Sequence, residues 1–194
     1  MKERIEHIWE YYRFQILLSI LFVVLVATVV PPLFDRPISS WRAFYINSEI
    51  SSEEAQELAD DFKLNVLGIE TDEHEIDIDT SMRFTTTDAT SIAISQMARF
   101  TAFIAGKEVD LVVSDEVIIE HYGELGGFVH LDALLTEEQL SEWKDRIYYV
   151  TEDEGEEEPV AIEVSEGIYA AVPLNSEKTR VSAQFIDYLI EGQQ

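Results

Sequence analysis

The longest apolar stretch of the chain covers residues 14–30 and contains no charged side chain. Pro31 and Pro32 end it. At about 1.5 Å of rise per residue it makes a helix of roughly 25 Å, close to the lower limit for crossing a bilayer core of about 30 Å. We therefore expect residues 14–32 to form a transmembrane signal anchor. The alternative is a cleaved signal peptide, although its candidate cleavage site, Ala27, lies inside the apolar stretch.

Basic residues flank the apolar stretch unevenly. Residues 1–13 contain three of them, whereas Arg36 and Arg42 are the first that follow the stretch. Because basic flanks stay on the cytoplasmic side of a membrane, we expect a cytoplasmic or interfacial segment at residues 1–13. The protein would then be a single-pass protein of the cell membrane with an extracytoplasmic C-terminal domain.

Beyond a short linker at residues 33–40, strand-like and helix-like patterns alternate. Strand-like segments are short buried apolar runs or strict alternations of polar and apolar residues, and helix-like segments repeat apolar residues every three or four positions. Because strand–helix–strand connections are right-handed, the order predicts one three-layer α/β domain, residues 41–194, with a mostly parallel sheet. The expected strands are 42–47, 74–80, 109–113, 147–150, 160–164 and 168–173, and the expected helices are 51–62, 89–105, 115–122, 136–146 and 177–192.

The chain is strongly acidic, with 39 acidic and 13 basic residues and a net charge of -26. Three of the acids precede the apolar stretch, so 36 lie in the outer part. We therefore expect neither nucleic acid nor an anionic lipid surface as a partner. Such an excess of carboxylates also suits a protein exposed to high salt or high external pH.

The chain has no cysteine, which excludes disulfides, thiol nucleophiles and Cys-ligated metal sites. An outer domain without disulfides favours a bacterial cell surface, and we expect a Gram-positive one. The four histidines lack metal-ligand spacing, and no phosphate loop, zinc-protease or serine-hydrolase motif is present. We therefore expect no catalytic residue, no metal and no cofactor.

Polar residues that are suited to capping helices follow four of the expected strands. In open parallel sheets a ligand binds outside the carboxyl ends of the strands, beside the first turns of the helices. Hydroxyl, amide and free N–H groups would converge there on a polar solute, although each residue also has an ordinary role as a helix cap. The candidate ligand-binding residues are Asn47, Ser48, Thr85, Thr86, Ser114, Asp115 and Asn175.

Acidic residues gather at two further places. Glu75, Asp77 and Asp79 share one face of an expected strand, which favours a solvated face over a calcium or acid–base site. Residues 152–158 hold six acids without the spacing of a calcium loop, which favours a solvated hairpin tip.

Three segments together indicate a known family. Residues 109–115, Val-Asp-Leu-Val-Val-Ser-Asp, resemble a strand of the Asp-Val-Val type that leads into a helix. Residues 127–140 place Leu-Asp and an acidic, Leu-bearing helix after a glycine-containing loop. Residues 172–189 combine Val-Pro-Leu-Asn-Ser with a helix containing Ala-Gln-Phe-Ile-Asp-Tyr-Leu. This order resembles the first lobe of extracellular solute-binding proteins of bacterial ABC transporters. The resemblance implies the fold of one such lobe.

The chain departs from that family in one important respect. Members of the family insert a whole second lobe where this chain has only residues 147–167, so we expect no hinged cleft that closes over a solute. We therefore expect a non-catalytic accessory subunit that holds its domain against a membrane protein, such as an ABC-type permease. The alternative is a small-molecule receptor that binds a polar solute at the C-terminal edge of the sheet.

Overall fold

The computed structural model describes residues 14, 18, 19, 22, 39–68, 74–151 and 156–192. Within those ranges every helix is too short or too polar to span a bilayer.

The chain divides into two compact units, Met1–Ile38 and Ser39–Gln194. In the first unit, the four described residues are helical and exposed. The rest of the predicted anchor at residues 14–32 lies outside the described residues, as do the cytoplasmic segment 1–13 and most of the linker 33–40. The anchor therefore stays a prediction from the sequence.

The second unit is built on a single mixed sheet. Its described strands are β1 (Ser39–Tyr45), β2 (His74–Asp79), β3 (Leu111–Asp115), β4 (Ile147–Thr151), β5 (Glu157–Ser165) and β6 (Ile168–Ala171), in the spatial order β2-β1-β3-β6-β5-β4. β1 pairs in parallel with β2 and β3, whereas β3–β6, β6–β5 and β5–β4 are antiparallel. Four strands thus run in one direction, and β4 and β6 run in the other. The predicted α/β class with one sheet is confirmed.

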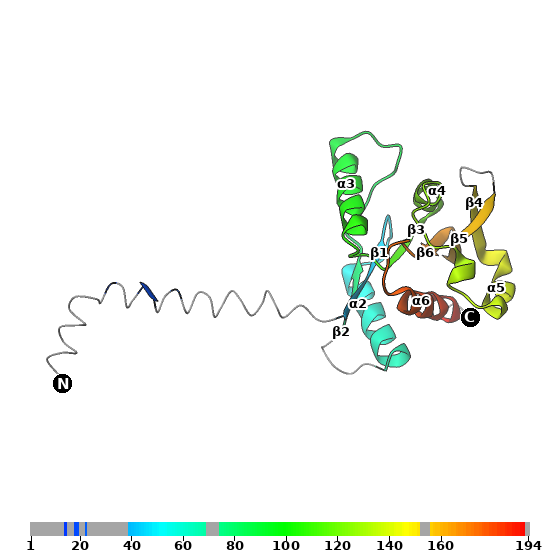
Figure 1. Cartoon of the computed structure of the whole chain (residues 1–194), viewed down its shortest axis with the longest axis horizontal. Coiled ribbons are helices and arrows are strands. Elements are labelled where there is room, and N and C mark those ends of the chain that lie inside the picture. The colour runs from blue at the N-terminus through cyan, green and yellow to red at the C-terminus, as the bar shows by residue number, and fades with distance from the viewer. Residues whose placement is uncertain are drawn as a thin grey trace. The chain divides into compact units, whose positions relative to one another are not determined.

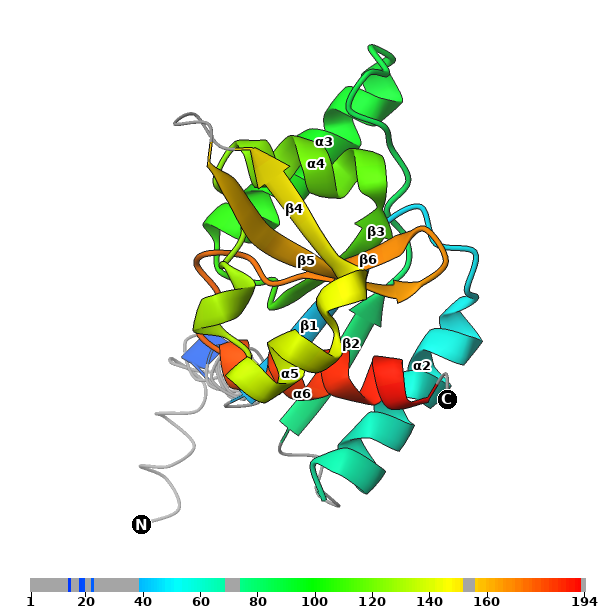
Figure 2. The same cartoon turned by 90° about the vertical axis from the view of Figure 1, so that its right-hand side faces the viewer.

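Helices cover both faces of this sheet, as the two views show (Figure 1, Figure 2). One face carries α2 (Ser52–Asp61) with its π-helical extension Phe62–Val66, α5 (Glu137–Glu142) between the 3-10 turns Leu131–Ala133 and Lys144–Arg146, and α6 (Thr179–Glu191). The other face carries α3 (Ser91–Ala105) and α4 (Glu116–Glu124).

Alternation along β1 explains how one strand serves two hydrophobic cores. Trp41 and Tyr45 belong to the core beneath α2 and α6, and Phe44 belongs to the core beneath α3 and α4, because successive side chains leave a strand on opposite faces. The ring centroids of Trp41 and Phe185 of α6 are 4.8 Å apart, and those of Phe44 and Phe100 of α3 are 6.1 Å apart. Both cores lie in the second unit, so we expect residues 39–194 to fold by themselves.

Local capping signals fix several helix starts. Ser51 Oγ accepts a hydrogen bond from the Glu54 backbone N–H at 3.2 Å, and the Glu54 carboxylate accepts one from the Ser51 N–H at 2.7 Å. Thr136 and Gln139 form the same reciprocal capping box before α5. Both starts match the sequence prediction.

The start of α3 differs from the prediction. Thr85 and Thr86 were among the expected capping residues, whereas the N-cap is Thr90, whose Oγ1 accepts from the Ala93 N–H at 3.3 Å. Met82 and Phe84 are buried in the core beneath α3. Their burial at alternate positions keeps the chain extended there and moves the helix start toward the C-terminus.

Candidate functional site

Asn47 joins three loops at the C-terminal edge of the parallel strands. Its φ of 58° is left-handed, a conformation that Asn tolerates better than most residues. Its Nδ2 donates to the Phe84 carbonyl oxygen at 2.9 Å and to Asp115 Oδ2 at 2.8 Å, and its Oδ1 accepts from the Phe84 N–H at 3.0 Å. Both amide hydrogens are used, so Asn47 has no donor left for a solute.

Ser114 and Asp115 meet Asn47 at this junction. Ser114 is 1% exposed, and its Oγ donates to the Ile46 carbonyl oxygen at 3.3 Å. Asp115 is the N-cap of α4, with Oδ1 accepting from the Ile118 N–H at 3.2 Å. These polar groups satisfy one another's hydrogen-bonding capacity. The junction therefore has a structural role, because its hydrogen bonds join the loops after β1, β2 and β3.

Of the other predicted residues, Asn175 lies away from this edge. Thr85 and Thr86 lie in the loop that leads to α3, where Thr85 is exposed. Asn175 follows β6, which is antiparallel to β3, so it lies at the opposite edge of the sheet and donates to the Ile104 carbonyl oxygen. The expectation that Asn175 converges with Asn47 is wrong, because the prediction took the last strand as parallel.

A cavity of about 550 Å³ opens beside the junction, on the face of the sheet that carries α2 and α6. It lies at the C-terminal ends of β1 and β3. From β1 the chain continues toward one side of the sheet, and from β3 it continues toward the other side. Open α/β sheets bind ligands at such a point. Its walls are mainly aliphatic, with Leu58 from α2, Leu189 from α6 and Ile168 from β6 among them. Asn47 and Ser48 also line it.

Tyr45, the last residue of β1, lines this cavity and is 6% exposed. Its hydroxyl oxygen is buried and has no hydrogen-bond partner among the described residues. Burial, and to a smaller extent the nearby Tyr188, raises the pKa of Tyr45 above its ordinary value, so the hydroxyl stays protonated. Tyr45 was not among the predicted site residues, because an aromatic side chain in a buried strand is ordinarily part of the core. Its position at the last residue of β1 was the available signal.

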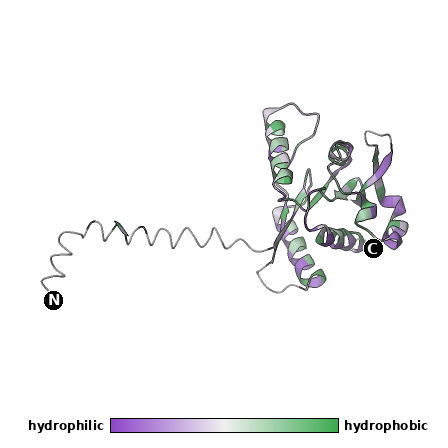
Figure 3. Cartoon of the chain, viewed as in Figure 1, coloured by the Kyte–Doolittle hydropathy of each residue, from purple (hydrophilic) through white to green (hydrophobic). Residues whose placement is uncertain are grey.

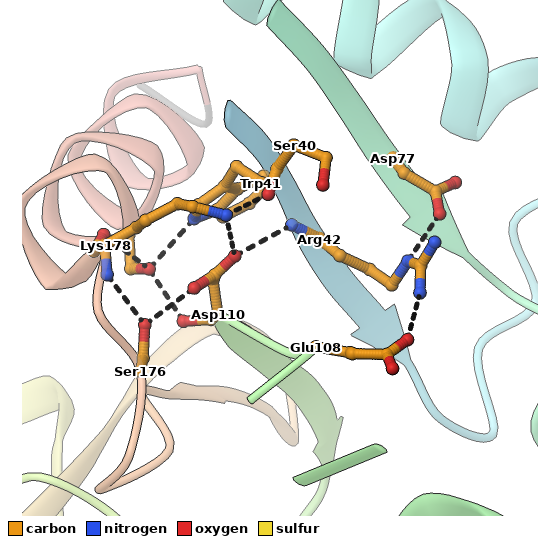
Figure 4. Close-up of polar contacts among 9 residues, drawn as sticks. Ser40, Trp41, Arg42, Asp77, Glu108, Asp110, Ser176 and Lys178 are labelled. Carbon is orange, nitrogen blue, oxygen red and sulfur yellow. Dashed lines mark hydrogen bonds and ion pairs between the residues drawn. The ribbon is translucent and has the colours of Figure 1, made fainter. Parts of the chain in front are cut away.

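A second polar cluster lies at the opposite edge, around the buried carboxylate of Asp110 (Figure 4). Asp110 Oδ1 accepts from Ser176 Oγ at 2.8 Å, and Oδ2 accepts from the Arg42 N–H at 3.2 Å and from Lys178 Nζ at 3.3 Å. Lys178 also donates to the Ser40 carbonyl oxygen. The cluster ties the first residues of β1 to the start of α6, so it fixes the strand at which the chain enters this unit.

The acidic face of β2 forms ion pairs. Asp77 accepts from Arg42 Nε at 2.6 Å, and Asp79 lies 3.4 Å from an Arg99 nitrogen. Among the described residues, no three His, Asp or Glu side chains come together in metal-binding geometry.

The outer face of α3 differs in charge and hydropathy from the rest of the strongly acidic domain. Residues 89–107 contain no acid, although they include Arg99 and Lys107. Ile92 is 71% exposed and Ile94 is 52% exposed. In the hydropathy colouring α3 is mostly green and white, whereas α5 is largely purple (Figure 3).

Small residues form a continuous seam on this face. They recur with steps of four, three, four and three residues, so they lie on one stripe of the helix. All five are exposed: Ser91, Ser95, Ala98, Ala102 and Ala105.

No protein-family model matches the chain, and the searches of curated proteins and of solved structures give no match either. The resemblance to solute-binding proteins therefore stays a prediction from residues 109–140 and 172–189.

Proposed function

We propose that the protein is a membrane-anchored, non-catalytic accessory subunit that docks its outer domain on a membrane protein through α3. The observation that carries this proposal is the exposed seam of small residues on an acid-free, apolar helix. We call the five residues Ser91, Ser95, Ala98, Ala102 and Ala105 the α3 seam.

The α3 seam has the geometry of a helix-docking surface. Small side chains at heptad-like spacing let a second helix approach closely, so that main-chain atoms and flanking side chains make close van der Waals contact. Ile92 and Ile94 flank the seam and expose apolar surface that gains stability when a partner covers it.

Charge supports the same choice of surface. The domain as a whole repels acidic partners, whereas α3 itself carries Arg99 and no carboxylate. A partner with a neutral or mildly acidic helix would therefore meet least repulsion at α3.

The predicted anchor supplies proximity to a membrane partner. The eight residues 31–38 between the apolar stretch and β1 reach at most about 28 Å when fully extended. A short tether suits a domain whose partner lies in the same membrane. The resemblance of three segments to solute-binding proteins favours an ABC-type permease as that partner.

A charge placed on the seam tests the proposal. Full-length protein with an affinity tag is purified in mild detergent from membranes of the source organism, and stoichiometric companions are quantified by mass spectrometry. Ala98→Glu should lower the recovery of a membrane-protein companion at least tenfold, because it places a carboxylate in the contact. Ala133→Glu, the same change at an exposed residue of the Leu131–Ala133 turn, is the matched control and should leave the recovery unchanged.

Two results would overturn the proposal. One is an equal loss of the companion with both variants, which would indicate a non-specific charge effect. The other is a companion that is retained in full by Ala98→Glu.

A further inference from the structure

The outer edge of β2 has no partner strand among the described residues. β2 is the first strand in the order of the sheet and pairs with β1, and no backbone hydrogen bond joins it to a described residue outside β1. The main-chain N–H and C=O groups of every second residue of such an edge strand point outward without a partner. We propose that this edge binds an extended, basic segment of a partner protein as an added strand. The inference does not depend on docking through α3, because it uses the main-chain groups of a different element.

β2 lacks the features that keep edge strands from pairing further. Its register with β1 is regular over the whole strand, His74–Asp79, and the strand contains no proline and no lysine. The other edge strand, β4, has a register shift between Tyr148 and Tyr149, and such irregularities twist an edge away from additional strands. Of the two edges, the one at β2 is therefore better suited to strand addition.

The charge around this edge selects a basic partner. β2 contains three acids and α2, which packs against β2, contains five, and neither element contains lysine or arginine. Two of these eight acids pair with arginines, and the remaining six form no ion pair with a described basic residue. A second copy of the same edge would bring like charges together, whereas a basic segment would be attracted.

The alternation of side chains along β2 indicates the pattern of the added segment. Ile76 and Ile78 face the core beneath α2 and α6, so Glu75, Asp77 and Asp79 lie on the other face of the sheet. A segment that alternates lysine or arginine with an aliphatic residue would place its charges beside the acids and its aliphatic side chains beside the isoleucines.

A hollow of about 600 Å³ lies beside the C-terminal half of β2 and provides space for side chains of an added strand. Asp77 and Asp79 line it from the strand, and Ser51 lines it from the start of α2. Arg83 also lines it, so the attraction for a basic side chain is strongest at the other end of the strand, beside Glu75.

A fluorescein-labelled peptide, Lys-Ile-Lys-Ile-Lys-Ile, is the probe. Its binding to the full-length protein in a non-ionic detergent is followed by fluorescence anisotropy at low ionic strength, with detergent alone as the background. Glu-Ile-Glu-Ile-Glu-Ile has the same alternation with the opposite charge, and the lysine peptide N-methylated at every residue keeps the charge but has no N–H group to donate. We expect saturable binding of the lysine peptide and at least tenfold weaker binding of the other two.

Substitutions and hydrogen exchange then locate the binding. Glu75→Lys, at an exposed residue of β2, should weaken binding of the lysine peptide about 3-fold, a usual effect of one exposed charge pair. Glu166→Lys, the same change in the exposed turn between β5 and β6, is the matched control and should bind normally. Mass spectrometry should show slower amide exchange in residues 74–79 when the peptide is bound, and unchanged exchange in residues 147–151 of β4.

Four results would overturn the inference. The first is no saturable binding of the lysine peptide, and the second is equal binding of its N-methylated form, which would indicate attraction by charge alone. The third is an equal effect of the two substitutions. The fourth is unchanged exchange in residues 74–79, which would place the peptide elsewhere or show that the edge is already covered.

Discussion

Removing the Asp110 carboxylate should destabilise the domain by breaking the cluster that joins β1 to α6. The side chain is 4% exposed and serves as acceptor for the Arg42 N–H, the Ser176 hydroxyl and the Lys178 ammonium. Asp110→Ala leaves the Arg42 N–H and the Ser176 hydroxyl without an acceptor in a poorly solvated place. Each unsatisfied donor lowers the free energy of unfolding by about 1–2 kcal/mol. Lys178 is 30% exposed, so water replaces most of its lost contact. The expected total is about 3 kcal/mol.

Urea unfolding of residues 39–194, followed by far-UV circular dichroism, measures this loss. With a slope of about 2 kcal/mol per molar urea for a domain of this size, the midpoint should fall by about 1.5 M. Asp110→Asn keeps one acceptor oxygen and nearly the same volume, so it should cost about half as much. Asp132→Ala, at an exposed acid, is the control and should stay within about 0.25 M of the parent. A shift below about 0.5 M for Asp110→Ala would show that this carboxylate contributes little to holding β1 against α6.

Two further predictions concern the pH dependence of stability. Burial and the hydrogen bond to Asp61 raise the pKa of Tyr188 from 10.0 to about 12, so the stability this contributes is complete below pH 10 and is lost as pH rises toward 12. The urea midpoint should therefore fall less between pH 9 and 11 in Tyr188→Phe than in the parent protein. An equal fall in both proteins would contradict the raised pKa of Tyr188. Hydrogen bonds from Ser51 lower the pKa of Glu54 below 4.5, so its contribution is present above pH 4.5 and is lost as pH falls through the lowered value. Carbon-detected NMR titration should show this lowered pKa and only a partial return toward 4.5 in Ser51→Ala, because that variant removes the hydroxyl and keeps the backbone N–H that is the main cause. Equal values in both proteins would count against a part for the Ser51 hydroxyl in lowering the pKa.

Local signals in the sequence predicted the elements well. Ser51, Thr136 and Asp115 each begin a helix where expected, because a capping residue acts on N–H groups only two or three positions away. Alternating apolar residues likewise located β2, which is an edge strand of the sheet. These features depend on neighbours in the chain, which a sequence displays directly.

Features that depend on distant partners were harder to predict. The direction of β6 follows from its pairing with β3 and β5, and no local pattern reveals it, so Asn175 was placed at the wrong edge. No local pattern reveals the buried role of Asp110 either, because its partners lie 66 and 68 residues away along the chain. The unpaired hydroxyl of Tyr45 is also visible only once the surrounding helices are in place.

The proposed function requires contact between α3 and a membrane protein, and site-specific photocrosslinking in intact membranes detects such a contact. A photoreactive amino acid replaces Ala102 in the α3 seam in one protein and Ala133 in another, both exposed positions. We expect an ultraviolet-dependent adduct with a membrane protein from position 102 and none from position 133. No adduct from position 102, or the same adduct from both positions, would contradict it.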